Sequence, residues 1–314
     1  MSLRADCSKR SLVLMDIQTI PGALLLLRFA LQMAFSIGIV AKPRPEVLEL
    51  AAELRRWLRA RKAEVLFDES TASHLARTRP ATLKSLRNSD LLVTLGGDGT
   101  LLQGAGLLGG AKVPLFGVNM GYLGFLTEIS RARLFPVLED VLDGRVEIED
   151  RMLLRVELFR EDKKRLSGLV LNDAVVTKGA LARMMVLDCF IDQRDVARYR
   201  ADGLIVATPT GSTAYTLSAG GPIVYPTMRG MIIAPICPHT LTQRPLVVSH
   251  SSVIRLVVSP GGDNLYLTLD GQRGRPLKPN DEIVVREARR KVYLVRDPTV
   301  HFFQVLRDKL GWGG

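Results

Sequence analysis

A short apolar run that ends in a glycine-rich turn constrains this chain more than any other feature. Residues 91–95 are Leu-Leu-Val-Thr-Leu, and Gly-Gly-Asp-Gly-Thr follows at 96–100. Such runs are typical of central strands in a parallel sheet. The glycines let the backbone turn tightly and approach a ligand closely, and Thr100 can cap the first turn of the apolar segment 100–108. We therefore expect a strand, a turn and a helix whose first amides suit a phosphate group, with Asp98 beside them.

Two common nucleotide-binding motifs do not match this turn. No lysine follows the glycines, so the turn is not a Walker loop, and Leu102 stands where the dinucleotide fingerprint requires its third glycine. Asp98 can accept a proton or hold a metal ion, and the turn alone does not choose between these roles. A glycine-rich turn without any ligand is the alternative that the local residues leave open.

Composition narrows the class of protein and of partner. A chain of 314 residues is long enough for two domains, and its net charge of +11 suits anionic partners. No block of five or six basic residues occurs, so we expect no nucleic-acid partner. Cys7, Cys189 and Cys237 lie far apart, which favours a reduced cytoplasmic protein over a disulfide framework or a zinc site.

The pattern of apolar residues divides the chain into an α/β part and a mainly β part. Strands and amphipathic helices alternate over residues 33–145, which predicts an open Rossmann-like parallel sheet. The expected strands there are 36–40, 63–67, 91–95 and 113–118, and the expected helices 45–58 and 131–142. Over residues 146–290 strand-like segments predominate, which predicts a mainly β domain. Those segments are 146–159, 165–177, 184–191, 204–207, 253–258, 265–269 and 283–285.

The two ends of the chain are interpreted separately. Residues 1–32 lack clear periodicity, and the run of four leucines at 24–27 is stopped by Arg28. This run is far too short to cross a bilayer, so we expect an unstructured extension rather than a functional leader, and no membrane partner. Residues 291–314 contain a strand at 291–295 and a helix at 302–310, and we expect them to pack back on the N-terminal domain. A ligand is expected between the two domains.

A second informative stretch covers residues 202–222. The expected strand 204–207 leads into a loop rich in hydroxyl groups and glycines, Thr-Pro-Thr-Gly-Ser-Thr-Ala-Tyr at 208–215 and Leu-Ser-Ala-Gly-Gly-Pro at 217–222. Hydroxyls and free amides can bind phosphate and ribose oxygens, and the ring of Tyr215 can stack on a base. A Ser/Thr-rich turn with a packed tyrosine is the alternative.

Taken together, these segments closely resemble bacterial NAD kinases over roughly residues 36–305. The shared segments are, in order, Ile-Val-Ala-Lys-Pro at 39–43, Gly-Gly-Asp-Gly-Thr at 96–100, Asn-Met-Gly-Tyr-Leu-Gly-Phe-Leu at 119–126, Asn-Asp at 172–173, Asp-Gly at 202–203, the two parts of the hydroxyl-rich loop, Pro-His-Thr-Leu at 238–241 and Asp-Gly-Gln at 270–272. The glycine–aspartate turn is shared with lipid kinases and phosphofructokinases. The hydroxyl-rich loop is the part that indicates NAD kinases.

The resemblance implies the reaction, the architecture and the partners. It implies that ATP phosphorylates the 2′-hydroxyl of the adenosine ribose of NAD to give NADP, with a divalent cation for which Mg²⁺ is expected. It also implies an α/β N-terminal domain, a β C-terminal domain and a cytoplasmic homo-oligomer, either a dimer or a tetramer. The ligands of the metal stay unassigned, because ATP can supply most of them.

The resemblance also assigns site residues. Asp98 would accept the proton of the 2′-hydroxyl, and Asp173 occupies a position where the family commonly has the longer Glu. Without the resemblance, Arg183 and Arg200 are ordinary solvated charges and Asp173 a turn cap. The residues implied to contact NAD are Asp98, Gly99, Asn172, Asp173, Arg183, Arg200, Asp202, Thr213, Ala214, Tyr215, Thr216, Leu217, Ser218 and Gln272.

Two other functions remain as alternatives at this point. A lipid or sugar kinase could use the same glycine–aspartate turn, but a lipid kinase should show an apolar acyl pocket or a membrane-binding face, and we find neither in the sequence. A non-catalytic NAD-binding sensor should have lost the acid at position 98, and Asp98 is present. The NAD kinase hypothesis is therefore preferred.

Overall fold

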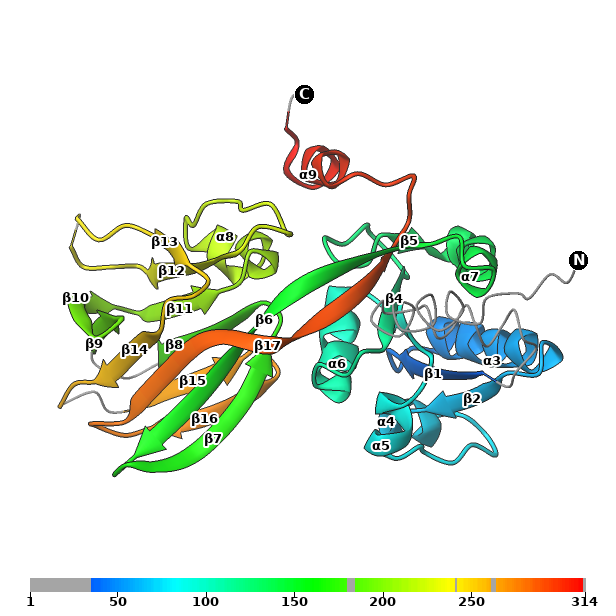
Figure 1. Cartoon of the computed structure of the whole chain (residues 1–314), viewed down its shortest axis with the longest axis horizontal. Helices are drawn as coiled ribbons and strands as arrows, with labels where there is room; N and C mark the ends of the chain where they lie inside the picture. Colours follow the sequence, from blue (N-terminus) through cyan, green and yellow to red (C-terminus); the bar gives the residue numbers. More distant parts are fainter. Residues whose placement is uncertain (1–34, 180–183, 241, 261–263, 313–314) are drawn as a thin grey trace, which may run out of the picture. The chain divides into compact units, whose positions relative to one another are not determined.

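The computed structural model describes residues 35–179, 184–240, 242–260 and 264–312, and Figure 1 draws them in sequence colours. The chain divides into two compact units, Met1–Glu149 with Tyr293–Gly314, and Asp150–Val292. The predictions for residues 1–32 and for Arg183 lie outside the described residues. In the described part of the chain, no helix is long and apolar enough to cross a membrane.

The first unit is built on a parallel sheet with the strand order β2-β1-β3-β4. Its strands are β1 (Ser36–Ala41), β2 (Glu64–Phe67), β3 (Leu91–Gly96) and β4 (Pro114–Asn119). All three pairs are parallel. On its other side β4 pairs with the short strand β5 (Ile129–Ser130) and with Tyr293 and Leu294 of the last strand, β17 (Glu282–Arg296). The expected open parallel sheet is confirmed.

Helices cover both faces of this sheet, which explains why its strands are apolar on both sides. On one face, α3 (Pro45–Ala60) and α7 (Leu134–Leu142) pack against alternate residues of β1, β3 and β4, such as Ile39, Val93 and Phe116. On the other face, α6 (Asp98–Leu108) lies so close that a methyl group at Gly104 would be 2.7 Å from Thr94 Cγ2. The other helical segments described in this unit are α4 (Glu69–Ser73), α5 (Leu83–Arg87), η1 (Arg131–Arg133) and α9 (Phe302–Leu310).

The second unit is mainly β, as expected, and packs two layers of antiparallel strands around one core. One layer has the order β13-β12-β11-β8-β15-β16, and its strands are β13 (Leu246–Ser249), β12 (Gly230–Ile236), β11 (Gly203–Ala207), β8 (Asp173–Lys178), β15 (Leu265–Leu269) and β16 (Arg273–Leu277). The other contains β6 (Glu147–Arg160), β7 (Lys163–Val170), β9 (Met185–Ile191), β10 (Arg194–Ala201), β14 (Ile254–Val258) and the first part of β17. Side chains of both layers, for example Val156 and Val206, form one buried cluster.

The six-stranded layer is also covered on its outer face. Val175, Ile205 and Ile232 point to this face and pack with Val224 and Ala219, which belong to the segment after β11. Strand β11 is consequently buried along its whole length. This packing fixes the hydroxyl-rich segment on the end of β11 and thereby positions the candidate site.

Several predicted elements differ from the structure. The segment 165–177 is not one strand but two, β7 and β8, and residues 171–172 lie between them. The segments 283–285 and 291–295 belong to one strand, β17. Strands β10, β12, β13 and β16 were not predicted; in β16, for example, four of five residues are exposed, so it carries no apolar pattern.

Candidate active site

In the first unit, the carboxylate of Asp98 is bound by the backbone of a neighbouring loop. Oδ2 accepts a hydrogen bond from Phe125 N at 2.9 Å. Oδ1 accepts from Leu126 N at 3.2 Å, from Thr127 N at 3.0 Å and from Thr127 Oγ1 at 2.9 Å. Four hydrogen-bond donors therefore fix the orientation of this side chain, and its carboxylate acts as the acceptor in all four hydrogen bonds.

The loop that supplies these donors is itself held by the end of β4. Asn119 is buried, its amide nitrogen donates to Thr127 Oγ1 at 3.0 Å, and its carbonyl oxygen accepts from Gly121 N at 2.7 Å. Gly124 allows the close approach, because a methyl group there would collide with Asp98 Oδ1. The ends of two adjacent parallel strands, β3 and β4, are thus joined through Asp98 and Asn119.

The turn before Asp98 differs in one detail from the prediction. Thr100 was expected to cap the helix, but α6 begins at Asp98, with Gly97 as its N-cap and no capping side chain. Thr100 instead packs on the preceding turn, where a methyl group at Gly96 would collide with its side chain. Apart from their chain neighbours and the backbone of the helix itself, methyl groups at Gly97 or Gly99 would meet no atom of the described residues within 4 Å, so there is room for a ligand beside the start of the helix. An open helix start with a positive dipole suits an anionic group.

In the second unit, Asp270 holds the segment that contains Asn172 and Asp173. Its Oδ2 accepts from Leu171 N at 2.9 Å, and its Oδ1 accepts from Asn172 N at 2.8 Å and Asp173 N at 3.1 Å. The amide of Asp270 donates in return to Asp173 O at 2.9 Å. Asp270 follows β15, and Asp173 begins the neighbouring strand β8, so the strand pairing brings the two carboxyl groups into one place.

The pKa values of both carboxyl groups are raised. Burial, and then the charge of Asp270, raise the pKa of Asp173 to about 7, and the Asp173 residue is only 5% exposed. Burial also raises the pKa of Asp270, although its three amide hydrogen bonds and the charge of Arg273 oppose this shift. Asp173 therefore changes charge near neutral pH, a behaviour common in functional sites.

The hydroxyl-rich loop lies directly against Asn172. Thr208 Oγ1 donates to Leu171 O at 2.5 Å, and Thr208 N donates to Asn172 O at 2.9 Å. Gly211 packs so tightly that a methyl group there would collide with the backbone of Asn172. The loop continues as η2 (Thr210–Thr213) and the single turn α8 (Tyr215–Ser218), and Ser212 fastens it to Val224 by two hydrogen bonds.

Three buried oxygens of this region have no partner within the described residues. They are Asn172 Oδ1, Thr210 Oγ1 and Thr216 Oγ1. Buried polar atoms are normally hydrogen-bonded, so each unpaired one requires an explanation. A ligand with hydroxyl or amide groups would satisfy them.

The structure distributes the expected site residues over both units. Asp98 and Gly99 belong to the first unit, and the other described ones belong to the second. Asn172 and Asp173 lie against the hydroxyl-rich loop, while Arg200, Tyr215, Ser218 and Gln272 are exposed. The remaining ones are Asp202, which pairs with Lys178 at 2.9 Å, and Thr213, Ala214, Thr216 and Leu217 within the loop.

Sequence reasoning missed the structural importance of Thr210, Gly124 and Asp270. All three lie in segments that carry the family resemblance, and that was the only available signal. Gly124 packs against Asp98 and Asp270 binds the amides of residues 171–173, all distant in sequence, so no local spacing rule could identify these contacts.

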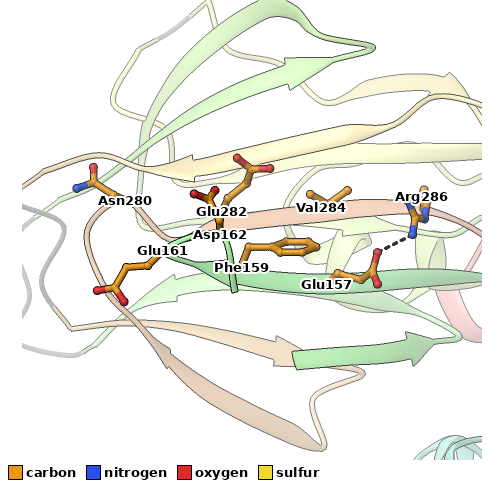
Figure 2. A pocket seen from close by; sticks show the side chains of 8 residues that line it. All are labelled: Glu157, Phe159, Glu161, Asp162, Asn280, Glu282, Val284 and Arg286. Carbon is orange, nitrogen blue, oxygen red and sulfur yellow. Dashed lines mark hydrogen bonds and ion pairs between the residues drawn. The ribbon is translucent and has the colours of Figure 1, made fainter. Parts of the chain in front are cut away.

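The cavity drawn in Figure 2 is separate from these residues. It has a volume of about 540 Å³, and the side chains around it come from β6, β17 and the turns at their ends. Its lining residues are Glu157, Phe159, Glu161, Asp162, Asn280, Glu282, Val284 and Arg286. None of them is a predicted site residue, and at one end Glu157 is already paired with Arg286.

The described residues also offer no ready metal site. No group of three or more His, Cys, Asp or Glu side chains that could hold a metal ion occurs among them. The structure therefore does not fit a metal ion held by protein side chains alone.

Comparisons with known proteins agree on one family. The family models described as ATP-NAD kinase N-terminal domain and C-terminal domain match residues 37–146 and 171–297. The NAD kinase of Solibacter usitatus is 46% identical over 278 residues, which cover 88% of this chain and 97% of the relative. The NAD kinase of Trichlorobacter lovleyi is 48% identical, with coverages of 88% and 98%.

Two solved structures have the same architecture. Yeast NADH kinase, crystallised with NADH, has a TM-score of 0.82 at 30% identity and covers 90% of this chain and 89% of its own. An NAD kinase from Archaeoglobus fulgidus, crystallised with ATP, has a TM-score of 0.71 at 27% identity, with coverages of 89% and 100%. These matches favour neither the lipid- or sugar-kinase alternative nor the non-catalytic sensor. The chain belongs to the NAD kinase family.

Proposed function

We propose that this enzyme transfers the γ-phosphate of ATP to the 2′-hydroxyl of the adenosine ribose of NAD, and that Asp98 accepts the proton of that hydroxyl. The observation that carries the proposal is the carboxylate of Asp98, which four donors hold at the open start of α6. A ribose hydroxyl is a poor nucleophile, and a positioned base typically contributes about 10²–10⁴-fold to the rate.

The hydrogen bonds of Asp98 identify the oxygen that would accept the proton. Oδ1 already accepts three hydrogen bonds, whereas Oδ2 accepts one, from Phe125 N. Because each carboxylate oxygen has about two lone pairs, Oδ2 retains one that can face a substrate. We therefore assign the role of proton acceptor to Oδ2.

NAD recognition is assigned to the second unit. The unpaired oxygens of Asn172, Thr210 and Thr216 can bind hydroxyl and amide groups of NAD. An ionised Asp173 can accept hydrogen bonds from sugar hydroxyls, and the exposed ring of Tyr215 can stack on a base. We retain the whole expected set as NAD contacts: Asp98, Gly99, Asn172, Asp173, Arg183, Arg200, Asp202, Thr213, Ala214, Tyr215, Thr216, Leu217, Ser218 and Gln272.

ATP is assigned to the turn at Gly96–Gly99, where the amides at the start of α6 can face its phosphates. A divalent cation, for which Mg²⁺ is expected, would neutralise the phosphate charges when bound. Since the described residues form no metal cluster, the phosphates of ATP are proposed as its main ligands.

Assembly and location complete the proposal. A homo-oligomer, dimer or tetramer, is supported by β13, an edge strand that exposes Leu246 and Val247, because unpaired edges favour association. Light scattering coupled to gel filtration tests it, and a monomer at enzyme concentrations used for assay would contradict it. A cytoplasmic location is proposed because the enzyme needs the cellular pools of ATP and NAD; fractionation of the source cells tests it.

A direct assay tests the reaction. The purified protein is incubated with ATP, MgCl₂ and NAD, and NADP is measured with a dehydrogenase that accepts only NADP. We expect NADP formation that requires ATP and is lost in Asp98→Asn. Absence of NADP with the wild-type protein, or phosphorylation of a lipid or sugar instead, would contradict the proposal.

A further inference from the structure

Asp270 is not among the residues expected to contact NAD, but it holds the backbone conformation of two residues that are, Asn172 and Asp173. Its carboxylate accepts hydrogen bonds from three consecutive amides, those of residues 171, 172 and 173. Its own amide donates to Asp173 O at 2.9 Å. Asp270 adopts a left-handed backbone with a φ of 49°, which turns the chain after β15 so that the side chain can reach these amides.

Thr208 holds the same segment from its carbonyl side. Its hydroxyl and its amide bind the carbonyl oxygens of Leu171 and Asn172, respectively. The backbone donors and acceptors of residues 171–173 are therefore paired with Thr208 and Asp270. These two residues follow β11 and β15, the strands on either side of β8. The side chains of this segment are left to meet a ligand, and Asn172 Oδ1 is buried with no hydrogen-bond partner among the described residues.

We propose that Asp270 is a positioning residue that aims the side chains of Asn172 and Asp173 at NAD through the three amides that it binds. This inference rests on the proposed NAD contacts of Asn172 and Asp173. Asp270 itself is not a catalytic residue, because it acts through the amides that it binds.

The charge of Asp270 gives this role a distinctive signature. Asp270 faces Asp173 from the end of β15, and Arg273, on β16, acts on Asp270 with the opposite charge. Burial and the charge of Asp270 bring the pKa of Asp173 to about 7. Because the ionised carboxylate is the better acceptor for sugar hydroxyls, the KM for NAD should fall as the pH rises through this region. Removal of the charge of Asp270 should move that transition to lower pH.

The test compares Asp270→Asn with Asp192→Asn. Asp192 is a matched control: its φ is 50°, its amide donates to Val253 O at 3.0 Å, and its carboxylate accepts from Val253 N at 2.8 Å. It holds residues 252 and 253, which are not site residues. Asparagine tolerates the left-handed backbone in both variants, so backbone strain is the same in both.

In Asp270→Asn, the side-chain amide would face the amide of Leu171, donor against donor. We expect the KM for NAD at pH 8 to rise about fivefold or more, as the loss of one buried hydrogen bond predicts. The KM for ATP should change less than twofold, and the pH transition of the KM for NAD should move to lower pH. Asp192→Asn should match the wild type in all three quantities.

A second variant keeps the inference testable if Asp270→Asn does not fold. Asp270→Glu keeps the charge but displaces the oxygens, so the KM for NAD should still rise while the pH transition stays in place. An unchanged KM for NAD in a folded variant at position 270, relative to the matching variant at Asp192, would overturn the inference. Failure of the proposed function is a different result, because the wild-type protein in the same assay would then form no NADP.

Discussion

Asp98 and Asp270 make the same contact in different units of the molecule, and their surroundings differ. Each carboxylate binds three consecutive backbone amides, residues 125–127 for Asp98 and residues 171–173 for Asp270. Asp98 starts an eleven-residue helix and receives a fourth hydrogen bond from a threonine hydroxyl. Asp270 follows a strand and lies beside a second carboxyl group, that of Asp173.

The difference shows that a carboxylate bound by three consecutive amides can serve either to orient the carboxylate or to orient the segment that carries the amides. At Asp98 the loop amides fix the carboxylate, which is the group proposed to react. At Asp270 the carboxylate fixes the amides, and the side chains carried by those amides are the groups proposed to bind. Changes on the Asp98 side should therefore lower kcat, and changes on the Asp270 side should raise the KM for NAD.

The largest effect is expected from Asp98→Asn, which keeps the size of the side chain and removes the proton acceptor. Turnover should fall at least about a hundredfold while NAD still binds, and titration calorimetry would measure that binding. Thr127→Val is the matched control, because it removes one of the four donors but leaves the carboxylate in place. Near-normal turnover in Asp98→Asn would remove this residue from the mechanism, and lost NAD binding would make it a binding residue.

The next largest effects are expected from two glycines, one that packs against Asp98 and one that packs against Asn172. A methyl group at Gly124 would collide with the carboxylate of Asp98, and one at Gly211 with the backbone of Asn172. We expect Gly124→Ala to lower kcat about tenfold, because it displaces the carboxylate of Asp98. We expect Gly211→Ala to raise the KM for NAD about tenfold, because it displaces Asn172. Steady-state kinetics with both substrates measures these quantities.

Two other glycines serve as controls for that experiment. Beyond its chain neighbours, a methyl group at Gly121 would meet no atom of the described part of the chain within 4 Å, and one at Gly274 would be 3.8 Å from Thr268 Cγ2. Alanine at either position should leave both kinetic constants within about twofold of the wild type. If Gly124→Ala affected only the KM for NAD, or Gly211→Ala only kcat, the two sides would have been assigned in reverse.

A smaller effect should follow from the hydroxyl-rich loop. Thr216 is fully buried and its hydroxyl has no partner among the described residues. Thr216→Val should raise the KM for NAD about threefold to tenfold and leave the KM for ATP nearly unchanged, because one hydrogen bond to NAD is lost. Thr268→Val is the control, since that hydroxyl donates to Val175 O. Equal changes for both substrates would contradict a role in NAD binding.

The sequence predicted the frame of the molecule better than the contacts within the site. Strands buried on both faces leave a continuous apolar run, so β3 and β4 were recognisable, and the predicted helix 302–310 has the bounds of α9. Exposed strands such as β16 carry no such pattern. The contacts of Asp98 and Asp270 join residues 27 to 99 positions apart. No periodicity relates such residues, because tertiary packing alone brings them together.

The smallest expected effect is on thermal stability, and it distinguishes the role of Asp173 from that of Asp270 within the second unit. The pKa of Asp173 is about 7 in the folded protein, raised by burial and by the charge of Asp270, against about 4 in an unfolded chain. Between these values the folded state holds a proton that the unfolded state has released, so the free energy of unfolding falls as the pH rises towards 7. Asp173→Asn removes this penalty. Its Tm, relative to that of the wild type, should therefore be higher at pH 8 than at pH 5 by about 2 °C or more.

Asp270→Asn should instead have a lower Tm than the wild type, because three amides would lose their charged acceptor. Scanning calorimetry of both variants at pH 5 and pH 8 measures the difference. A Tm difference for Asp173→Asn that is the same at both pH values would mean that Asp173 ionises normally in the folded state. The proposed pH dependence of NAD binding would then lose its physical basis, whereas the hydrogen bonds of Asp270 to the backbone would still position Asn172.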